Sequence, residues 1–231
     1  MASLHTTWRP KNLPPSTQIR FRHLGPLDVE SCLSLNSRCF RPSERWESCD
    51  YEFRLKRPDD YLIIGCFAND VLVGILLQDY EIFAPRKKMN RTMIGMSYSD
   101  AVRLHSKDHA PVFTPPPSGL SKHRTSWWRE SQLYKEAHTK LSCISILSVD
   151  PAYHRNGIGS ELMRLAFDVC RTRKERPNLI LLHVRKSNLA AQGLYKKMGF
   201  VERYVEEEFY EDENESETAL VMVKNLAEES S

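Results

Sequence analysis

The stretch that decides the fold runs from Leu141 to Ser160 and reads LSCISILSVDPAYHRNGIGS. Residues 141–149 form a short run of Leu, Ile and Val interrupted by small residues, which predicts a strand buried in a sheet. Asp150-Pro151 ends that strand. From about Gly157 to Arg171 the apolar residues recur at the i, i+3, i+4 and i+7 spacing of one buried helix face. A buried strand therefore passes through a turn with two glycines into the N-terminus of a helix.

The turn between this strand and this helix has the features of an anion-binding site. The first N–H groups of a helix have no partner within the helix and attract negative charge. Gly157 and Gly159 leave room for a phosphate to approach the backbone, and Arg155 adds positive charge. A G-x-G pair alone is equally typical of an ordinary tight turn, and the sequence matches neither the P-loop nor the dinucleotide-binding pattern. Both interpretations stay open on these residues alone.

Hydrophobic periodicity outside this stretch predicts alternating strands and helices. On the C-terminal side we expect a strand at 179–184, a helix at 189–198 that ends before Gly199, and two strands from Phe200. On the N-terminal side we expect a strand at 19–24, helices within 27–39 and 46–55, and a hairpin of strands 61–67 and 71–77. This order predicts an α/β layer architecture, in which ligand sites gather at strand ends and helix N-termini.

Three segments differ from this pattern. Residues 1–18 are polar and contain three prolines, so we expect an unfolded leader before one domain at 19–226. Residues 84–140 carry eleven Lys or Arg against four Asp or Glu, a local charge of +7. We expect a basic, largely unfolded insertion there, either a tolerated surface loop or an arm that binds RNA weakly or a protein partner. Residues 227–231 form a short tail.

The composition bounds the class of protein. With 231 residues, 41% hydrophobic residues and a net charge of +3, the chain suits one globular domain, and its bulk charge does not indicate nucleic-acid binding. Its six cysteines lack C-x-x-C or zinc-ligand spacing, so we expect neither disulfides nor a metal. No segment has the character of a signal peptide or a membrane anchor. We therefore expect a reduced, cytoplasmic protein, with the nucleus as a second location.

Several short motifs follow the turn, namely Leu182-His-Val184, Ser187-Asn188, Leu194–Phe200, Phe209-Tyr210 and Lys224-Asn-Leu226. Together with the turn they resemble the Gcn5-related N-acetyltransferase (GNAT) superfamily. Within it the chain is most similar to the NatE catalytic subunits of N-terminal protein acetyltransferases, and less closely to the NatF enzymes. The resemblance covers 144–226, with weaker matches in 19–77. It implies a single acyl-CoA N-acyltransferase domain, with a mixed central sheet flanked by helices, and acetyl-CoA as co-substrate without a metal.

The resemblance assigns residues to cofactor, substrate and chemistry. It implies acetyl-CoA binding by Leu147, Val149, His154, Arg155, Asn156, Gly157, Gly159, Ser160, Asn188 and Tyr195. It implies binding of the substrate N-terminus by Phe40, Pro42, Ser145, Phe209 and Tyr210. His183 matches the histidine that helps to remove the proton of the substrate amine through ordered water. Tyr195 can donate to the departing thiolate, and Cys143 stands where the family has a catalytic tyrosine.

The sequence departs from the family pattern in places besides Cys143. His154 stands where the turn usually opens with Arg or Gln, and Phe40–Glu44 matches the substrate-binding F-P-V-x-Y only in part. Alternatives also stay open for the chemical residues, since His183 and Tyr195 suit core positions and a buried Cys is usually a small hydrophobe. The cofactor site is therefore better supported than the substrate site.

We expect the protein to transfer an acetyl group from acetyl-CoA to the α-amino group of protein N-termini, by direct attack on the thioester. Its partners would be N-terminal peptides and a larger acetyltransferase complex on the ribosome. Residues 201–217, with a local charge of −8, are by default solvated surface but can attract a cationic substrate or the basic insertion. The alternatives are an acetyltransferase for lysine side chains or small amines, and a catalytically weak binding subunit of a ribosome-associated complex.

Overall fold

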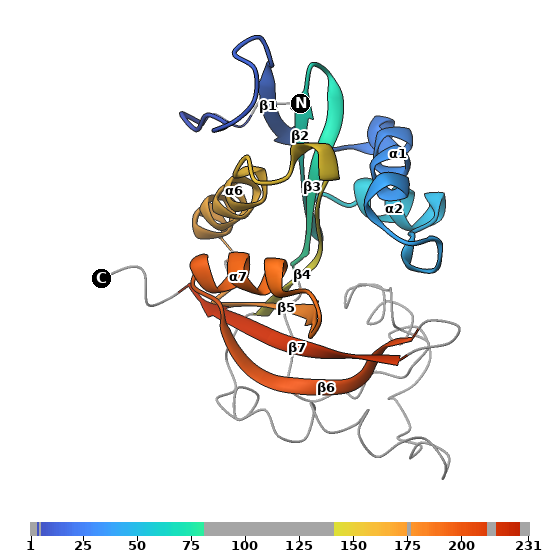
Figure 1. Ribbon diagram of the computed structural model, residues 1–231, viewed down its shortest axis with the longest axis vertical. Helices are drawn as coiled ribbons and strands as arrows, with labels where there is room; N and C mark the ends of the chain where they lie inside the picture. Colours follow the sequence, from blue (N-terminus) through green and yellow to red (C-terminus); the bar gives the residue numbers. More distant parts are fainter. Residues whose placement is uncertain (1–3, 5, 81–140, 175–176, 212–215, 227–231) are drawn as a thin grey trace.

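Seven strands form one mixed sheet that runs through the molecule (Figure 1). The computed structural model describes residues 4, 6–80, 141–174, 177–211 and 216–226. Within these residues the strands are β1 Ile19–His23, β2 Tyr61–Ala68, β3 Val71–Asp79, β4 Leu141–Val149, β5 Leu179–Arg185, β6 Val201–Glu211 and β7 Ser216–Asn225. Their order in the sheet is β1-β2-β3-β4-β5-β7-β6, and neighbouring strands are antiparallel except for the parallel pair β4 and β5.

Helices cover both faces of this sheet (Figure 1). On one face lie α1 (Val29–Cys39) and α2 (Ser48–Leu55), and on the other lie α6 (Ile158–Thr172) and α7 (Leu189–Lys197). Short 3-10 turns precede three of these helices, namely η1 (Pro26–Asp28), η2 (Pro42–Glu44) and η5 (Pro151–Tyr153). The elements follow the predicted order with shifts of one or two residues at their ends. The predicted α/β fold, a mixed central sheet flanked by helices, is confirmed.

Each face of the sheet has its own hydrophobic core. On the α6 face, Leu162 is fully buried against a cluster that includes Ile64 of β2. On the α1 face, Leu35 is fully buried in a cluster that includes the neighbouring strand residue, Ile63. Successive residues of a strand point to opposite faces, so a strand covered on both sides must be apolar throughout. This requirement explains why the central strands are continuous apolar runs in the sequence.

The strands β4 and β5 pair only along their first residues. Their parallel register joins Leu141–Ile144 to Leu179–Leu182, and beyond these residues the two strands separate. Ser145 has no partner on β3, because Leu77 pairs with Ile146 and the next β3 residue pairs with Ile144, so Ser145 forms a β-bulge that bends β4. In Figure 1, β5, β7 and β6 turn away from the direction of β2–β4. We call the gap between residues 145–149 and residues 183–185 the split.

The N-terminal segment differs from the sequence prediction. Leu4 donates its backbone N–H to the Phe21 carbonyl at 2.9 Å, and the Trp8 ring packs edge-on against the Phe21 ring at a centroid distance of 5.7 Å. Leu4 and Trp8 both contact the core on the α6 face. The prediction of an unfolded leader is therefore wrong for the described residues 4 and 6–18, because these two apolar side chains bury surface that the proline-rich composition did not indicate.

Two other predicted segments, 84–140 and 227–231, lie outside the described residues. Within the ranges that are described, the helices lack the combined length and apolar character needed to cross a bilayer.

Candidate active site

The turn that follows β4 bends through two left-handed residues before α6 begins. Arg155 has φ 62° and Gly157, the N-cap of α6, has φ 84°. Glycine adopts this conformation freely, whereas a residue with a side chain pays about 1–2 kcal/mol for it. The bend places the first residues of α6 at the carboxyl end of β4, and the leading N–H groups of a helix have no acceptor within it. The turn is thus a backbone site with positive polarity, and the exposed Arg155 adds a full charge beside it.

Side chains hold this turn from the inside. Asp150 accepts a hydrogen bond from the Ala152 N–H at 3.0 Å and pairs with Arg38 of α1, whose Nε lies 2.6 Å from the Asp150 carboxylate. The buried Asn156 amide donates to the carbonyls of Tyr153 and His154 at 3.2 and 3.1 Å. The Asn156 side chain, predicted to contact acetyl-CoA, is therefore occupied with fixing the turn. A turn fixed in this way needs little reorganisation to bind an anion.

The N-terminal segment supports the same turn from outside. Asn12 donates its backbone N–H to the Asn156 side chain at 3.1 Å, and the Thr6 hydroxyl donates to the buried Glu161 carboxylate on the first turn of α6. The Trp8 indole lies close enough to Gly157 that a Cβ there would sit 3.4 Å from the ring. These contacts make the N-terminal segment part of the wall behind the turn.

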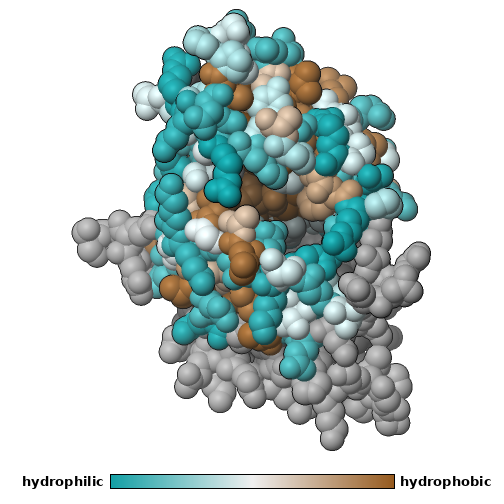
Figure 2. Space-filling model, viewed as in Figure 1, coloured by the Kyte–Doolittle hydropathy of each residue, from teal (hydrophilic) through white to brown (hydrophobic). Residues whose placement is uncertain are grey.

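The edge of β4 that faces the split has no strand partner beyond Ile144. Leu147 and Val149 lie along this edge and are partly buried. The His154 ring, which replaces the expected Arg or Gln, places Nε2 at 2.8 Å from the Val149 carbonyl and so contacts the end of the edge. Figure 2, drawn in the view of Figure 1, shows a hollow near the centre of the molecule, with apolar side chains on its floor and hydrophilic ones around it. An unpaired strand edge beside an apolar hollow suits an extended ligand that carries amide groups.

Gly159 and Ser160 lie in the first turn of α6, Asn188 is the N-cap of α7, and Tyr195 lies on α7. A Cβ on Gly159 would lie 3.2 Å from Leu194 Cδ2, so this glycine also lets α6 approach α7 closely. The Asn188 side-chain oxygen Oδ1 accepts the Ala191 N–H at 3.0 Å and caps α7. Burial raises the pKa of Tyr195 to about 12, so its phenol stays protonated near neutral pH and keeps a hydrogen to donate.

On the other side of the split, His183 lies on β5 one residue beyond the last residue paired with β4. Its Nε2 lies 3.3 Å from the Glu206 carboxylate of β6, and its ring stacks on Phe209 at a centroid distance of 4.2 Å and an angle of 5°. The side chains of His183 and Glu206 are only 19% and 12% exposed. The structure thus brings together His183, predicted to handle the proton, and Phe209, predicted to bind the substrate, and Glu206 lies beside them.

Ser145 lies across the split from this group and bonds a partly buried carboxyl group. The Ser145 hydroxyl donates to Asp79 at the end of β3, and burial raises the pKa of Asp79 while the bond from Ser145 opposes the rise. Cys143, two residues earlier, is partly buried against Leu179, Leu181 and Val223. Register places Cys143 beside Leu181, hence on the same face as His183. The environment of Cys143 is that of a packing residue.

Arg185 connects the two segments that were predicted to bind the substrate. Its guanidinium lies 2.8 Å from the Glu217 carboxylate of β7 and also pairs with Glu44 at the end of η2. The Tyr210 ring lies over the guanidinium, 4.1 Å from Cζ to the ring centroid, and burial raises the pKa of Tyr210. Phe40, half-buried after α1, and Pro42, exposed at the start of η2, belong to the segment that carries Glu44. The structure therefore brings residues 40–44 to the Phe209-Tyr210 segment.

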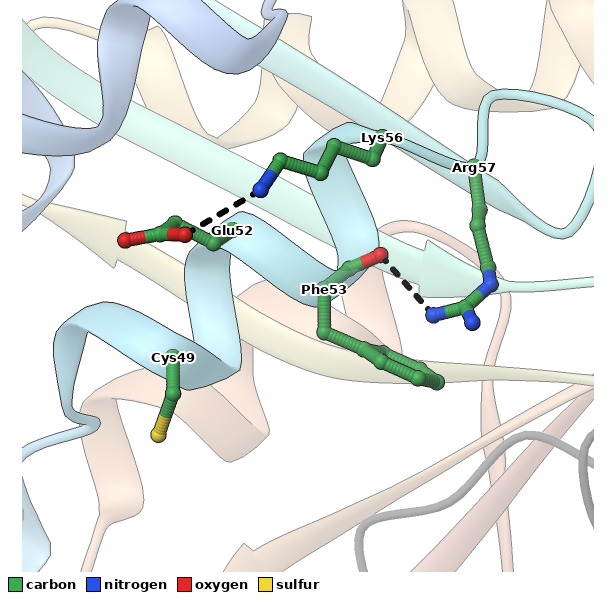
Figure 3. Close-up of a pocket in the computed structure, with 5 residues that line it drawn as sticks. All are labelled: Cys49, Glu52, Phe53, Lys56 and Arg57. Carbon is green, nitrogen blue, oxygen red and sulfur yellow. Dashed lines mark hydrogen bonds and ion pairs between the residues drawn. The ribbon is translucent and has the colours of Figure 1, made fainter.

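A surface pocket elsewhere on the molecule has a different character (Figure 3). It lies along α2 and is lined by Cys49, Glu52, Phe53, Lys56 and Arg57. Lys56 pairs with Glu52 at 3.1 Å, and Arg57 donates to the Phe53 carbonyl at 3.2 Å, so its polar groups bond one another. The helix α2 covers the face opposite to α6, and no predicted site residue lines this pocket. Among the described residues there is also no cluster of three or more His, Cys, Asp or Glu side chains that could hold a metal ion.

A mixed sheet that splits between two parallel strands, next to a fixed turn with free helix amides, is the architecture of an acyl-CoA N-acyltransferase. The model of the acetyltransferase (GNAT) family matches residues 29–200, and this chain belongs to that family. The match spans β4, the turn, α6 and β5, as well as α1 and α2, and it ends before β6 and β7.

Individual relatives agree with this fold. The ribosomal protein bS18 alanine N-acetyltransferase of Escherichia coli K12 is 34% identical over 76 residues, which are 33% of this chain and 50% of that protein. The chain spans about half the length of the curated relatives it matches. The crystal structure of Arabidopsis thaliana NAA60 in complex with acetyl-CoA has a TM-score of 0.61 at 18% identity and covers 91% of this chain and 99% of that one. The Escherichia coli S18 alanine N-acetyltransferase structure has a TM-score of 0.58 at 16% identity, over 90% and 94%.

Several residues of the site were not predicted from the sequence. Glu206 lies within the acidic stretch that was interpreted as solvated surface, and Asp79 ends a strand that gave no sign of a site. Glu44, Arg185 and Glu217 come from three separate elements, and only the folded chain joins them. A nearly continuous acidic run offers no signal that singles out one buried carboxylate among exposed ones.

Proposed function

We propose that this protein transfers an acetyl group from acetyl-CoA to the α-amino group of protein N-termini. One observation carries the proposal. The turn with free helix amides follows β4, His183 lies on β5, and these two strands are the two sides of the split. Acetyl-CoA is an anionic, extended molecule with two amides, which suits the turn and the unpaired β4 edge. A reaction between a bound thioester and an amine needs orientation and a route for the proton. The turn and the β4 edge orient the thioester, and His183 on β5 takes the proton.

The chemistry follows from the residues at each wall. An α-amine has a pKa of about 8, so His183 has only to take a proton from a group that is partly neutral near pH 7. The neutral amine then attacks the thioester carbonyl, the C–N bond forms and the C–S bond breaks. Tyr195 supplies a proton to the leaving thiolate, and the second amine proton replaces it. His183 and Tyr195 thus act on opposite ends of one displacement.

The bridge formed by Arg185 favours a chain end over an internal lysine. Glu44 and Glu217 are held to the same guanidinium, so the segment after α1 and the β6–β7 pair are tied together beside the split. An internal lysine has a polypeptide chain on both sides, and this bridge would obstruct one of them. An N-terminal residue has a chain on one side only, so the bridge leaves room for it. The carboxylates around Arg185 also favour a cationic amine over a neutral or acidic group.

The names of relatives support the same acceptor class. The bacterial relatives are described as alanine N-acetyltransferases of ribosomal protein bS18, and NAA60 was also solved with a bisubstrate analogue. We extend this to a NatE-like activity on protein N-termini in the cytoplasm, with a ribosome-bound complex as the setting. A similar fold occurs in the NatC complex bound to a peptide and CoA, at a TM-score of 0.55 and 16% identity.

The test is an acetylation assay with a mixed peptide library. The full chain is incubated with acetyl-CoA and peptides that differ in their first two residues, and the acetylated atom is located by tandem mass spectrometry. A matched library with blocked N-termini and free lysines separates α-amine from side-chain transfer. We expect transfer to free N-termini alone. Transfer only to lysines or small amines would overturn the acceptor class, and acetyl-CoA binding without transfer would favour a binding subunit.

A further inference from the structure

We propose that Glu206 is a positioning residue that fixes the proton of His183 on Nε2, so that Nδ1 is the atom that accepts the substrate proton. This inference rests on the proposed function for its role in transfer, but the pairing itself concerns the free protein. A neutral imidazole carries one N–H, and the group bonded to that N–H decides which nitrogen keeps a lone pair. The Glu206 carboxylate, an acceptor only, faces Nε2 at 3.3 Å.

The local backbone brings Glu206 and Phe209 to the same ring. On β6, Glu206 and Tyr210 are four residues apart, while their partners on β7, Ala219 and Glu217, are two residues apart. The two extra residues form a bulge, which re-aims side chains and is common next to active sites. As a result, Phe209 stacks on the plane of His183 while Glu206 contacts its edge. Two contacts in perpendicular directions leave the imidazole one orientation.

The burial of Glu206 indicates a functional role for its carboxylate. Its side chain is 12% exposed, and its Oε1 atom is buried without a hydrogen-bond partner among the described residues. A buried carboxylate with a free oxygen is costly to the fold, and such groups persist where they serve a function. When His183 takes a proton from the substrate amine, the imidazolium forms beside this carboxylate, which stabilises the new charge.

Other charged and titratable groups share this face of the sheet and would act on the same proton. They are Arg185 on β5, Glu44 at the end of η2, Glu217 on β7, Cys143 on β4 and Asp79 on β3. Arg185 is paired with both Glu44 and Glu217, and Asp79 is bonded by Ser145. Glu206 is the carboxylate that contacts the His183 ring directly, so removing its charge should have the largest effect.

The experiment compares the full chain with Glu206→Gln, Glu206→Ala and a control, Glu202→Gln. Glu202 is exposed on the same strand, so its replacement removes an equal charge without touching His183. Nitrogen-15 NMR of the histidine rings, with His183→Ala to assign the signal, reports the tautomer without any need for activity. We expect Nε2–H in the wild type and in Glu206→Gln, which keeps an acceptor oxygen, and a mixture of tautomers in Glu206→Ala.

The kinetic arm measures kcat and the KM for acetyl-CoA. In Glu206→Gln kcat should fall at least about 10-fold with the KM for acetyl-CoA unchanged, because the imidazolium forms without a carboxylate beside it. A wild-type His183 signal with the proton on Nδ1, or a Glu206→Ala protein that keeps the wild-type tautomer and the wild-type kcat, overturns the proposal. If no peptide is acetylated, the proposed function fails, and the tautomer of Glu206→Ala still decides the positioning role.

Discussion

Ser160 shows how one position can separate fold stability from ligand binding. It is the third residue of α6, counted from the N-cap Gly157, and so belongs to the turn that carries the free amides. A negative side chain at this place interacts favourably with the helix N-terminus, yet it competes with any anionic ligand for the same N–H groups. A substitution that helps the helix can therefore harm binding.

Replacing Ser160 with Asp should lower the affinity for acetyl-CoA at least about 10-fold while the Tm stays the same or rises, since an acid in the first turn contributes about 0.3–1 kcal/mol to a helix. Isothermal calorimetry and thermal unfolding measure the two quantities. Ser160→Ala, which adds no charge, should bind acetyl-CoA within a few-fold of the wild type. Undiminished affinity in Ser160→Asp would show that the phosphate groups of acetyl-CoA bind elsewhere.

His183 and Cys143 should differ sharply when each is replaced by Ala. Loss of the proton acceptor is expected to lower kcat by roughly 10²- to 10⁴-fold in His183→Ala. Cys143 packs against three apolar side chains, so Cys143→Ala should keep kcat within a few-fold and lower the free energy of unfolding by about 1 kcal/mol. Steady-state kinetics and urea titration check both variants. A large loss of kcat in Cys143→Ala would give the thiol a chemical role.

Single strands and helices could be predicted from the sequence, whereas contacts between distant elements could not. The strand at 141–149 and the helix after Gly157 were predicted because periodicity is a local property, and both are confirmed as β4 and α6. The split was not predicted from the residues, because it depends on where the pairing of β4 with β5 stops. The contact of Glu206 with His183 depends on a bulge whose register only the folded sheet defines.

The bridge through Arg185 joins elements that are distant in the sequence, and its loss should affect the substrate rather than the cofactor. In Arg185→Met the segment with Glu44 is released from β7, so the KM for the peptide should rise several-fold while the affinity for acetyl-CoA is unchanged. Arg203→Met, which removes an exposed charge on β6, is the matched control. An unchanged peptide KM in Arg185→Met would separate this bridge from substrate binding.

The N-terminal segment should contribute to the cofactor site through Trp8. Trp8→Ala removes the ring that lies against Gly157 and Phe21, and we expect a loss of about 2 kcal/mol in stability and a several-fold weaker affinity for acetyl-CoA. Trp8→Phe keeps an aromatic ring and should lose much less of both. Calorimetry on the two variants makes the comparison. If Trp8→Ala and Trp8→Phe bind acetyl-CoA with the same affinity, the N-terminal segment stabilises the fold without contributing to the cofactor site.

For the whole molecule, one carboxylate gives stability a defined dependence on pH. Hydrogen bonds from Ser187 and the ion pair with Arg185 lower the pKa of Glu217 to about 2. A carboxylate whose folded-state pKa lies below its unfolded value of about 4.3 stabilises the fold above that value, and the contribution is lost as the pH falls through the folded one.

The stability difference between the wild type and Glu217→Gln should therefore be largest above about pH 5 and disappear progressively down to about pH 2. Urea titrations at near-neutral and acidic pH measure it, and added salt should reduce it because the pair is partly exposed. Glu207→Gln, a change at an exposed carboxylate, should show no such trend. A difference that is constant with pH would contradict the assigned pairing.

The short contact between β4 and β5 has a consequence for the amount of this protein in a cell. Four residue pairs join the two strands. Under the proposed function, acetyl-CoA would bind beside this short contact, touch both halves of the sheet and have no site on the unfolded chain. Saturation to about 100 times the Kd stabilises a fold by about 2.7 kcal/mol, and changes of that size alter how often a chain is exposed to proteases. When the supply of acetyl-CoA falls, turnover of the protein should rise, so that metabolic state sets its abundance as well as its rate.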